Sequence, residues 1–164
     1  MKVFKAPMPY KDHDSLATVF LAGSIEMGTA ENWQAVVEQE FNDYKDDVLT
    51  ILNPRRTEFR VEEPQTPDNE YFNEQVLWEL NGMETSHYIF MYFHPDTKAP
   101  ITLMELGLYA DSGKLIVVCP DGFWRKGNVQ IVCEAYNVPV YNTLKDGMKE
   151  LRHALNYDQN LFLK

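Results

Sequence analysis

Two glutamates, Glu79 and Glu105, stand where apolar residues would otherwise be expected. Glu105 is the more unusual, because the segment 101–110 around it is apolar on nearly every face, and a helix of that kind is normally buried. A buried carboxylate costs free energy unless it is paired, hydrogen-bonded or facing a cleft. A carboxylate that faces a cleft is a candidate for acid–base or nucleophilic chemistry. A Glu at the rim of the core, or one bonded to a backbone amide, is the alternative interpretation.

The elements that must position these glutamates alternate along the chain. Short apolar runs bounded by turn residues predict buried strands, and the segments between them have helical spacing. The predicted strands are 18–22, 48–52, 88–93, 115–119 and 138–141, the last at an edge because Pro139 cannot donate to a ladder. The predicted helices are 30–44, 70–83, 100–112, 123–136 and 143–156.

Buried strands that alternate with helices indicate βαβ units and a parallel sheet. The sequence therefore predicts an α/β fold: a flavodoxin-like, doubly wound five-stranded parallel sheet in the order 2-1-3-4-5, with helices on both faces. The chain length suits a single domain, 1–164. Residues 1–15 predict a polar arm, and residues 57–69 predict a loop long enough to be a lid or a binding loop.

Ligands of such sheets bind beyond the carboxyl ends of the strands, at the point where the strand order reverses. For this order the crevice lies between the first and third predicted strands. Four segments are expected around it: 23–25, 53–56, 92–102 and 120–128. Glu105 lies on the helix that leaves the third predicted strand.

The composition excludes several classes of function. A formal net charge of -10 argues against a nucleic-acid polymer as partner, because phosphate binding needs a basic surface. No apolar run is long enough to span a bilayer, and the first residues lack the layout of a signal peptide. Cys119 and Cys133 lie in apolar segments, which predicts buried, reduced thiols and a cytoplasmic location. The histidines lack metal-ligand spacing, and there is no glycine-rich phosphate fingerprint.

Five motifs along residues 19–141 resemble those of nucleoside 2-deoxyribosyltransferases, within the wider group that includes deoxynucleotide N-hydrolases. Each motif alone is weakly specific, and their order on the expected elements makes the set more specific. The motifs are FLAGSI (20–25), NPRR (53–56), QVLWELNGM (75–83), PITLMELG (100–107) and PDGFWRKGNV (120–129).

The resemblance implies catalytic roles for both glutamates. Glu105 occupies the position of the family's nucleophile, in a MELG motif. That carboxylate attacks C1′ of the deoxyribose, expels the base and passes the sugar from a covalent glycosyl ester to an incoming base. Glu79 stands where the family has an Asp that contacts the base, just before Leu-Asn-Gly. The alternative is that Glu79 belongs to the solvated face of its helix.

Two positions depart from the family pattern. Many members have a Tyr at the end of the first strand that steadies the nucleophile, where this chain has Val19 and Phe20. Tyr92 is a possible replacement, and the hydroxyl could also be absent. Many members have an Asp six residues before the nucleophile, where this chain has Ala99. Asp96 could bind the sugar in its place, or it could be an ordinary turn residue.

Four further residues are candidates for substrate binding. Gly23 and Ser24 end the first predicted strand, where related hydrolases hold a 5′-phosphate or 5′-hydroxyl, and a helix cap or turn is the alternative for Ser24. Asn128 could reach the sugar in a neighbouring subunit's site, or cap a helix. Trp124 could stack on a base or cover the core. The basic pair at 55–56 could bind a phosphate or form salt bridges.

The function predicted from the sequence is transfer of 2-deoxyribose between nucleobases through a glycosyl-Glu105 intermediate, with no metal and no cofactor. Two alternatives stay open: hydrolysis of nucleosides or their 5′-monophosphates, and a nucleotide- or nucleobase-binding module without turnover. The implied partners are small-molecule nucleosides and nucleobases, not a nucleic-acid polymer or a membrane. The resemblance also implies a homo-oligomer, because sites in the family are often completed by a neighbouring subunit.

Overall fold

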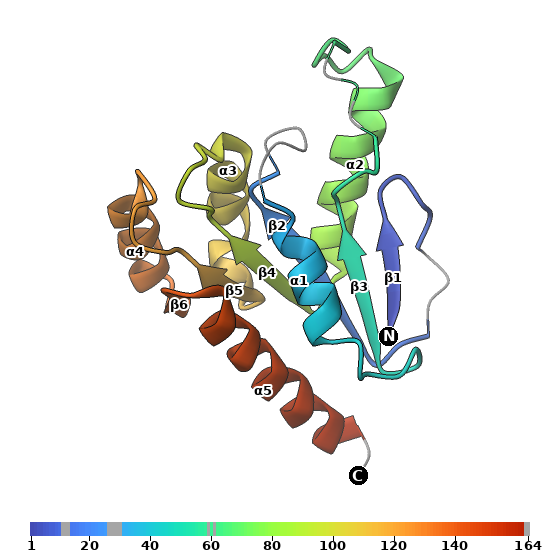
Figure 1. Ribbon diagram of the computed structural model, residues 1–164, viewed down its shortest axis with the longest axis vertical. Coiled ribbons are helices and arrows are strands. Elements are labelled where there is room, and N and C mark those ends of the chain that lie inside the picture. The colour runs from blue at the N-terminus through green and yellow to red at the C-terminus, as the bar shows by residue number, and fades with distance from the viewer. Residues whose placement is uncertain (11–13, 26–30, 59, 61, 163–164) are drawn as a thin grey trace.

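The core of the molecule is a parallel sheet. The computed structural model describes residues 1–10, 14–25, 31–58, 60 and 62–162. Within these residues the sheet has six strands in the order β1-β3-β2-β4-β5-β6, and every neighbouring pair is parallel (Figure 1). The strands are β1 (Lys2–Lys5), β2 (Ala17–Gly23), β3 (Leu49–Asn53), β4 (Tyr88–Tyr92), β5 (Leu115–Val118) and β6 (Val140–Tyr141).

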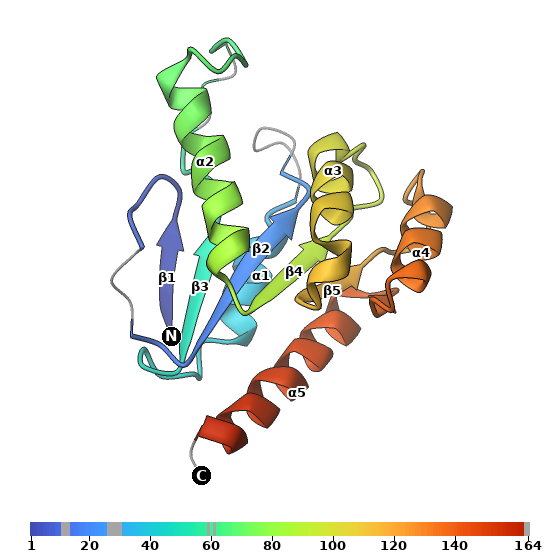
Figure 2. The same ribbon diagram turned by 180° about the vertical axis from the view of Figure 1, so that it is seen from behind.

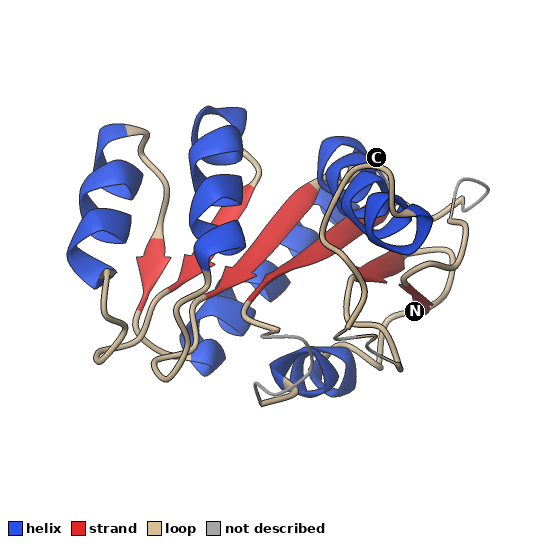
Figure 3. Cartoon of the chain, turned by 90° about the horizontal axis from the view of Figure 1, so that it is seen from above, coloured by secondary structure: helices blue, strands red, loops and turns tan. Residues whose placement is uncertain are grey.

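Helices cover both faces of this sheet. α2, α3 and α4 pack on one face and α1 and α5 on the other, and Figures 1 and 2 show the two faces in turn. Figure 3 shows the strands between the two helical layers. The predicted α/β fold with a parallel sheet is confirmed. The helices are α1 (Trp33–Glu40), α2 (Glu70–Thr85), α3 (Pro100–Tyr109) with a 3-10 turn η2 (Ala110–Ser112), α4 (Lys126–Ala135) and α5 (Leu144–Phe162).

The predicted count of five strands, in the order 2-1-3-4-5, is wrong. The additional strand is β1, which lies in the segment expected to be a polar arm and pairs with β3, with Val3 opposite Ile51. β1 has only four residues and a lysine at each end, so its apolar residues are too few to give a recognisable strand pattern. The other strands follow one another across the sheet in the predicted succession.

Several elements have ends that differ from the prediction. β6 is shorter than expected and begins only after Pro139. α1 ends at Glu40, where the backbone of Phe41 leaves helical geometry, and its predicted start at Ala30 lies outside the described residues. α5 continues past residue 156. The described residues between β3 and α2 form neither helix nor strand, which agrees with the predicted loop.

Two glycines allow a close approach of the elements around the crevice. At Gly23 (φ +145°) a Cβ would lie 2.3 Å from the carbonyl oxygen of Tyr92, so glycine is required where β2 ends beside β4. At Gly82 a Cβ would lie 2.8 Å from the Phe20 ring, so α2 rests directly on β2. The first contact brings the ends of β2 and β4 together, and the second fixes α2 against β2.

Candidate active site

The two glutamates lie on neighbouring helices of the same face, Glu79 on α2 and Glu105 on α3. α3 begins at Pro100, whose fixed φ suits a first helical position, directly after Ala99 in a left-handed conformation (φ 45°). Glu105 is 7% exposed and the adjacent Leu106 is 2% exposed, so the predicted burial of this part of the helix is confirmed. Glu79 is partly exposed.

The structure brings the two carboxylates within electrostatic reach of each other. Burial raises the pKa of Glu105 to about 8, and the negative charge of Glu79 adds to the rise. Burial also raises the pKa of Glu79 to about 7, although the hydrogen bond from Gln75 and the charge of Arg56 oppose it. Gln75 Nε2 donates to Glu79 Oε1 over 2.7 Å. Within the described part of the chain, no donor is hydrogen-bonded to the Glu105 carboxylate.

These carboxyl groups retain a proton near neutral pH mainly because burial disfavours the ionised form, and the charge of Glu79 adds to this effect at Glu105. One carboxyl can then serve as an acid while the other is ionised. Glu79 accepts a hydrogen bond from Gln75 and its charge acts on Glu105, so it has contacts beyond those of a solvated helix face, and its catalytic role stays a prediction. The arrangement can therefore supply a proton and a carboxylate nucleophile at one place.

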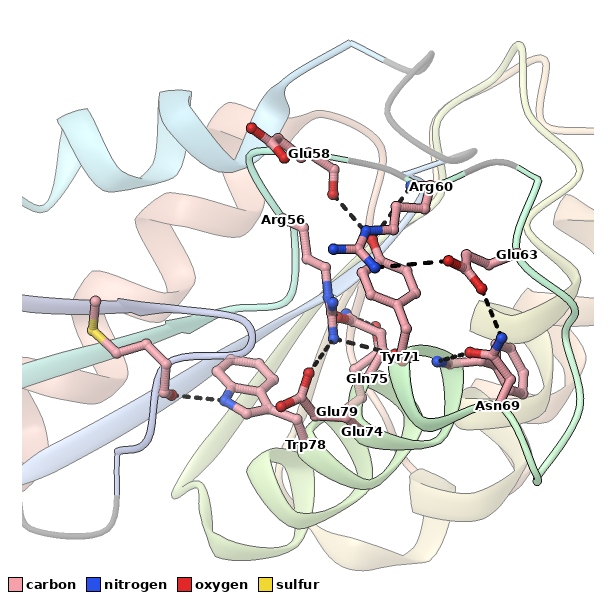
Figure 4. A network of polar contacts seen from close by, with 12 residues as sticks. Arg56, Glu58, Arg60, Glu63, Asn69, Tyr71, Glu74, Gln75, Trp78 and Glu79 are labelled. Carbon is pink, nitrogen blue, oxygen red and sulfur yellow. Dashed lines mark hydrogen bonds and ion pairs between the residues drawn. The ribbon is translucent and has the colours of Figure 1, made fainter.

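Gln75 was not singled out from the sequence, and neither was the link from Arg56 to Glu79 (Figure 4). Arg56 is 8% exposed; its Nε donates to Gln75 Oε1, and its Nη2 donates to Glu74 Oε2 over 3.0 Å. Its guanidinium also lies 4.0 Å from the centre of the Tyr71 ring. The salt-bridge interpretation of the basic pair is thus confirmed for Arg56. The available signal for Gln75 was its i, i+4 spacing from Glu79 on one helix.

The hydroxyl of Ser24 is engaged within the fold, in a side chain that is 1% exposed. Thr97 Oγ1 donates to the His94 carbonyl over 2.9 Å, so the 2.7 Å contact between the two hydroxyls uses the Ser24 proton. Ser24 Oγ also accepts the His94 backbone N–H over 3.0 Å. Ser24, next to Gly23, therefore joins the end of β2 to the loop after β4, which agrees with the turn interpretation.

Tyr92 packs on the opposite face of the sheet from α3. Because side chains alternate along a strand, Met91 and Phe93 face α2 and α3 while Tyr92 faces α1. The Tyr92 ring lies 5.3 Å from the ring of Trp33, centre to centre. The structure does not support Tyr92 as the hydroxyl that steadies Glu105, and its contact with substrate stays a prediction.

Asp96 is exposed in the turn after β4. Its backbone N–H donates to His94 Nδ1 over 3.2 Å, which agrees with the turn interpretation. Burial raises the pKa of Tyr92, and the charges of Glu31 and Asp96 add to the rise, so Asp96 lies near the end of β4. Binding of a sugar hydroxyl by Asp96 stays a prediction.

A groove of about 500 Å³ lies between α3 and α4. Asn128 is exposed on its wall, and the N-cap of α4 is Arg125, so Asn128 is not the helix cap. Trp124 is 53% exposed, and its Nε1 donates to the Lys98 carbonyl over 3.1 Å. The core position is taken by Phe123 instead. The groove is lined by Leu103, Leu106, Gly107, Trp124, Arg125, Asn128, Val129 and Val132.

Comparison with known proteins identifies the class. The family described as nucleoside 2-deoxyribosyltransferase like matches residues 17–123, which include both glutamates and the strands β2 to β5. The chain belongs to this family. A search of curated proteins found no match.

No helix in the described residues of the chain is long and apolar enough to cross a membrane. In the same residues, His, Cys, Asp and Glu side chains form no group of three or more that could hold a metal ion.

The carboxylate pair predicts a pH-dependent stability. A folded-state pKa of about 8 for Glu105, above its usual 4.5, means that the stability linked to its proton is present below pH 4.5 and is lost as the pH rises through 8. Glu105→Gln carries no charge at any pH. We expect the variant to be about 1–3 kcal/mol more stable than wild type at pH 9 and close to it at pH 5.

Urea unfolding of both proteins from pH 5 to pH 9 measures this difference. Glu84→Gln, at an exposed position of α2, is the matched control and should follow wild type throughout. An equal loss of stability with rising pH in wild type and Glu105→Gln would contradict the assignment.

Proposed function

We propose that the protein transfers 2-deoxyribose between nucleobases by cleavage of the N-glycosidic bond. The observation that carries the proposal is the pair of Glu79 and Glu105 on adjacent helices, with both pKa values raised mainly by burial, in a chain of this family. Retaining glycosidases also use two carboxyl groups, a nucleophile and an acid–base, at one sugar.

The proposed reaction has two steps. The pair shares one proton, and the form that reacts has this proton on Glu79, although Glu105 has the higher pKa. Ionised Glu105 attacks C1′, the glycosidic C–N bond breaks, and the proton of Glu79 moves to the departing base. An incoming base then attacks C1′ of the glycosyl ester, the bond to Glu105 breaks, and the proton of the new base returns to Glu79. Each step balances in electrons and protons with the two glutamates alone, so neither step requires a metal or a cofactor. Asp96 is proposed to orient the sugar.

Nucleosides are better supported as substrates than their 5′-monophosphates. The features that favoured a phosphate were Ser24 and the basic pair at 55–56. The Ser24 hydroxyl is used between β2 and β4, and Arg56 is paired with Glu74 and Gln75. The negative formal charge of the chain also opposes a dianionic substrate.

A transfer assay tests the proposed function. Mixing the protein with thymidine or deoxyinosine and excess free adenine or cytosine should give a new deoxynucleoside by chromatography. We expect Glu105→Gln to lose about 10³-fold or more of this rate, because the nucleophile is removed, while Glu84→Gln stays near wild type.

Other results would redirect the proposal. Free base without a new nucleoside would overturn the transferase in favour of the hydrolase. If no nucleoside or monophosphate turns over, both enzymes are wrong and the binding module remains.

We also propose that the protein works as a homo-oligomer in the cytoplasm. Ile101, Met104 and Leu108 form one stripe of α3 and are 56%, 57% and 60% exposed, and Leu77 of α2 is 57% exposed. These residues lie on the helices that carry the two glutamates, so a second copy on this face would cover the site. The free thiols of Cys119 and Cys133 support a reducing compartment.

Light scattering after size exclusion tests the assembly. We expect wild type to elute as an oligomer and Met104→Glu to shift toward the monomer, because a charge in the apolar stripe would be buried without a partner. Tyr157→Glu, at an exposed aromatic residue of α5 on the other face, is the control and should keep the wild-type mass. A monomeric wild type would contradict the proposal.

A further inference from the structure

Gln75 lies between Arg56, the only buried cation described near the two glutamates, and the carboxylate of Glu79 (Figure 4). It lies one helical turn before Glu79 on α2. Its Nε2 donates to Glu79 Oε1 over 2.7 Å and to the Pro54 carbonyl over 2.9 Å, and its Oε1 accepts from Arg56 Nε. Both ends of the amide are therefore engaged at once.

The chemistry of Arg56 determines which way the Gln75 amide points. A guanidinium has only donors, so it must face the amide oxygen. The amide nitrogen then faces the Glu79 carboxylate, which accepts. With the amide reversed, the oxygen of Gln75 would face the oxygens of Glu79, and its NH₂ would face the donors of Arg56.

Arg56 is itself held in place. Its Nη2 donates to Glu74 Oε2 over 3.0 Å and to the Tyr71 carbonyl over 3.3 Å, and its guanidinium stacks on the Tyr71 ring. Arg60 also lies over this ring, 4.9 Å from its centre, so Tyr71 contacts two cations. The start of the loop after β3 is thereby held against the first turns of α2.

The charged groups around Glu79 lie in two directions. Arg56 acts from the loop after β3 and favours the ionised carboxylate of Glu79, whereas on the side of α3 the charge of Glu79 itself disfavours ionisation of Glu105. On α2 itself, Glu74 is turned to Arg56, and Gln75 is the group that contacts Glu79. Gln75 is therefore the contact through which the loop after β3 reaches the carboxylate pair.

We propose that Gln75, oriented by Arg56, is the positioning residue that fixes the Glu79 carboxyl group toward the leaving base. The proposal rests on the proposed function of the pair. It assigns to Gln75 no contact with substrate. Gln75 acts by holding one oxygen of Glu79, which leaves the other oxygen of Glu79 to exchange a proton with the base.

Gln75→Met tests this role, because it keeps the length of the side chain and removes both donors and the acceptor. We expect kcat for transfer to fall about tenfold with a smaller change in KM, as for the loss of a hydrogen bond to a charged group. The limb of the pH profile that reports Glu79 should move up by about one unit, since Glu79 loses a donor that favours its ionised form.

Two further variants separate positioning from folding. Gln75→Glu has the same shape but turns an oxygen toward Glu79, so it should move this limb further than Gln75→Met does. Glu74→Gln contacts the same guanidinium without reaching Glu79, and it should leave the pH profile at the wild-type position. A general loss of fold would lower the active fraction in each variant without moving the limb.

A second readout does not depend on turnover. With ¹³C-labelled glutamate, and Glu79 assigned by Glu79→Gln, the carboxyl titration of Glu79 should have a higher midpoint in Gln75→Met than in wild type. If wild type turns over no substrate, the proposed function fails while this titration still tests Gln75. An unchanged midpoint in folded Gln75→Met would overturn the proposal for Gln75 alone.

Discussion

The removal of two neighbouring carboxylates from water, partial for Glu79 and nearly complete for Glu105, is the constraint on which the rest of the structure depends. Glu79 is compensated by a hydrogen bond from Gln75 and by the charge of Arg56, whereas Glu105 has neither among the described residues. The pair therefore relieves its repulsion by retaining a proton. A site of this kind is poorly stable when empty and fully ionised, and it favours a ligand that takes up the proton or brings positive charge.

Close contacts on each side of the pair offset this cost in free energy. Gly82 lets α2 rest directly on Phe20 of β2, and Gly23 lets the end of β2 pass close to β4. Ser24 then ties these two strand ends together through His94. The close contact of Gly82 with the Phe20 ring thus sets α2 against the sheet, and the contacts of Gly23 and Ser24 hold the ends of β2 and β4 together.

Much of this could be predicted from residue patterns, because it is local. The apolar runs predict the parallel sheet, and a carboxylate in an apolar helix indicates Glu105. β1 was missed because four residues carry too little pattern. The side of the sheet that Tyr92 faces depends on strand register, since a shift of one residue moves a side chain to the other face. The link from Arg56 to Gln75 joins two separate elements, so no local pattern contains it.

One outcome shows how a correct local interpretation can be incomplete. The helix around Glu105 is apolar on nearly every face, which indicates burial, and its inner residue Leu106 is buried. Its outer residues, such as Met104, are exposed in the single chain. The proposed oligomer would reconcile the two observations, because a second copy would bury the outer face.

The most direct test of the central claim is to locate the sugar on the protein. Wild type is mixed rapidly with thymidine in the absence of an acceptor base, quenched in acid and digested, and the peptides are mapped by mass spectrometry. The account predicts one deoxyribosyl group on the peptide that contains Glu105, at Glu105 itself, and none in Glu105→Gln. A sugar on another residue, or undiminished turnover by Glu105→Gln, would contradict the account.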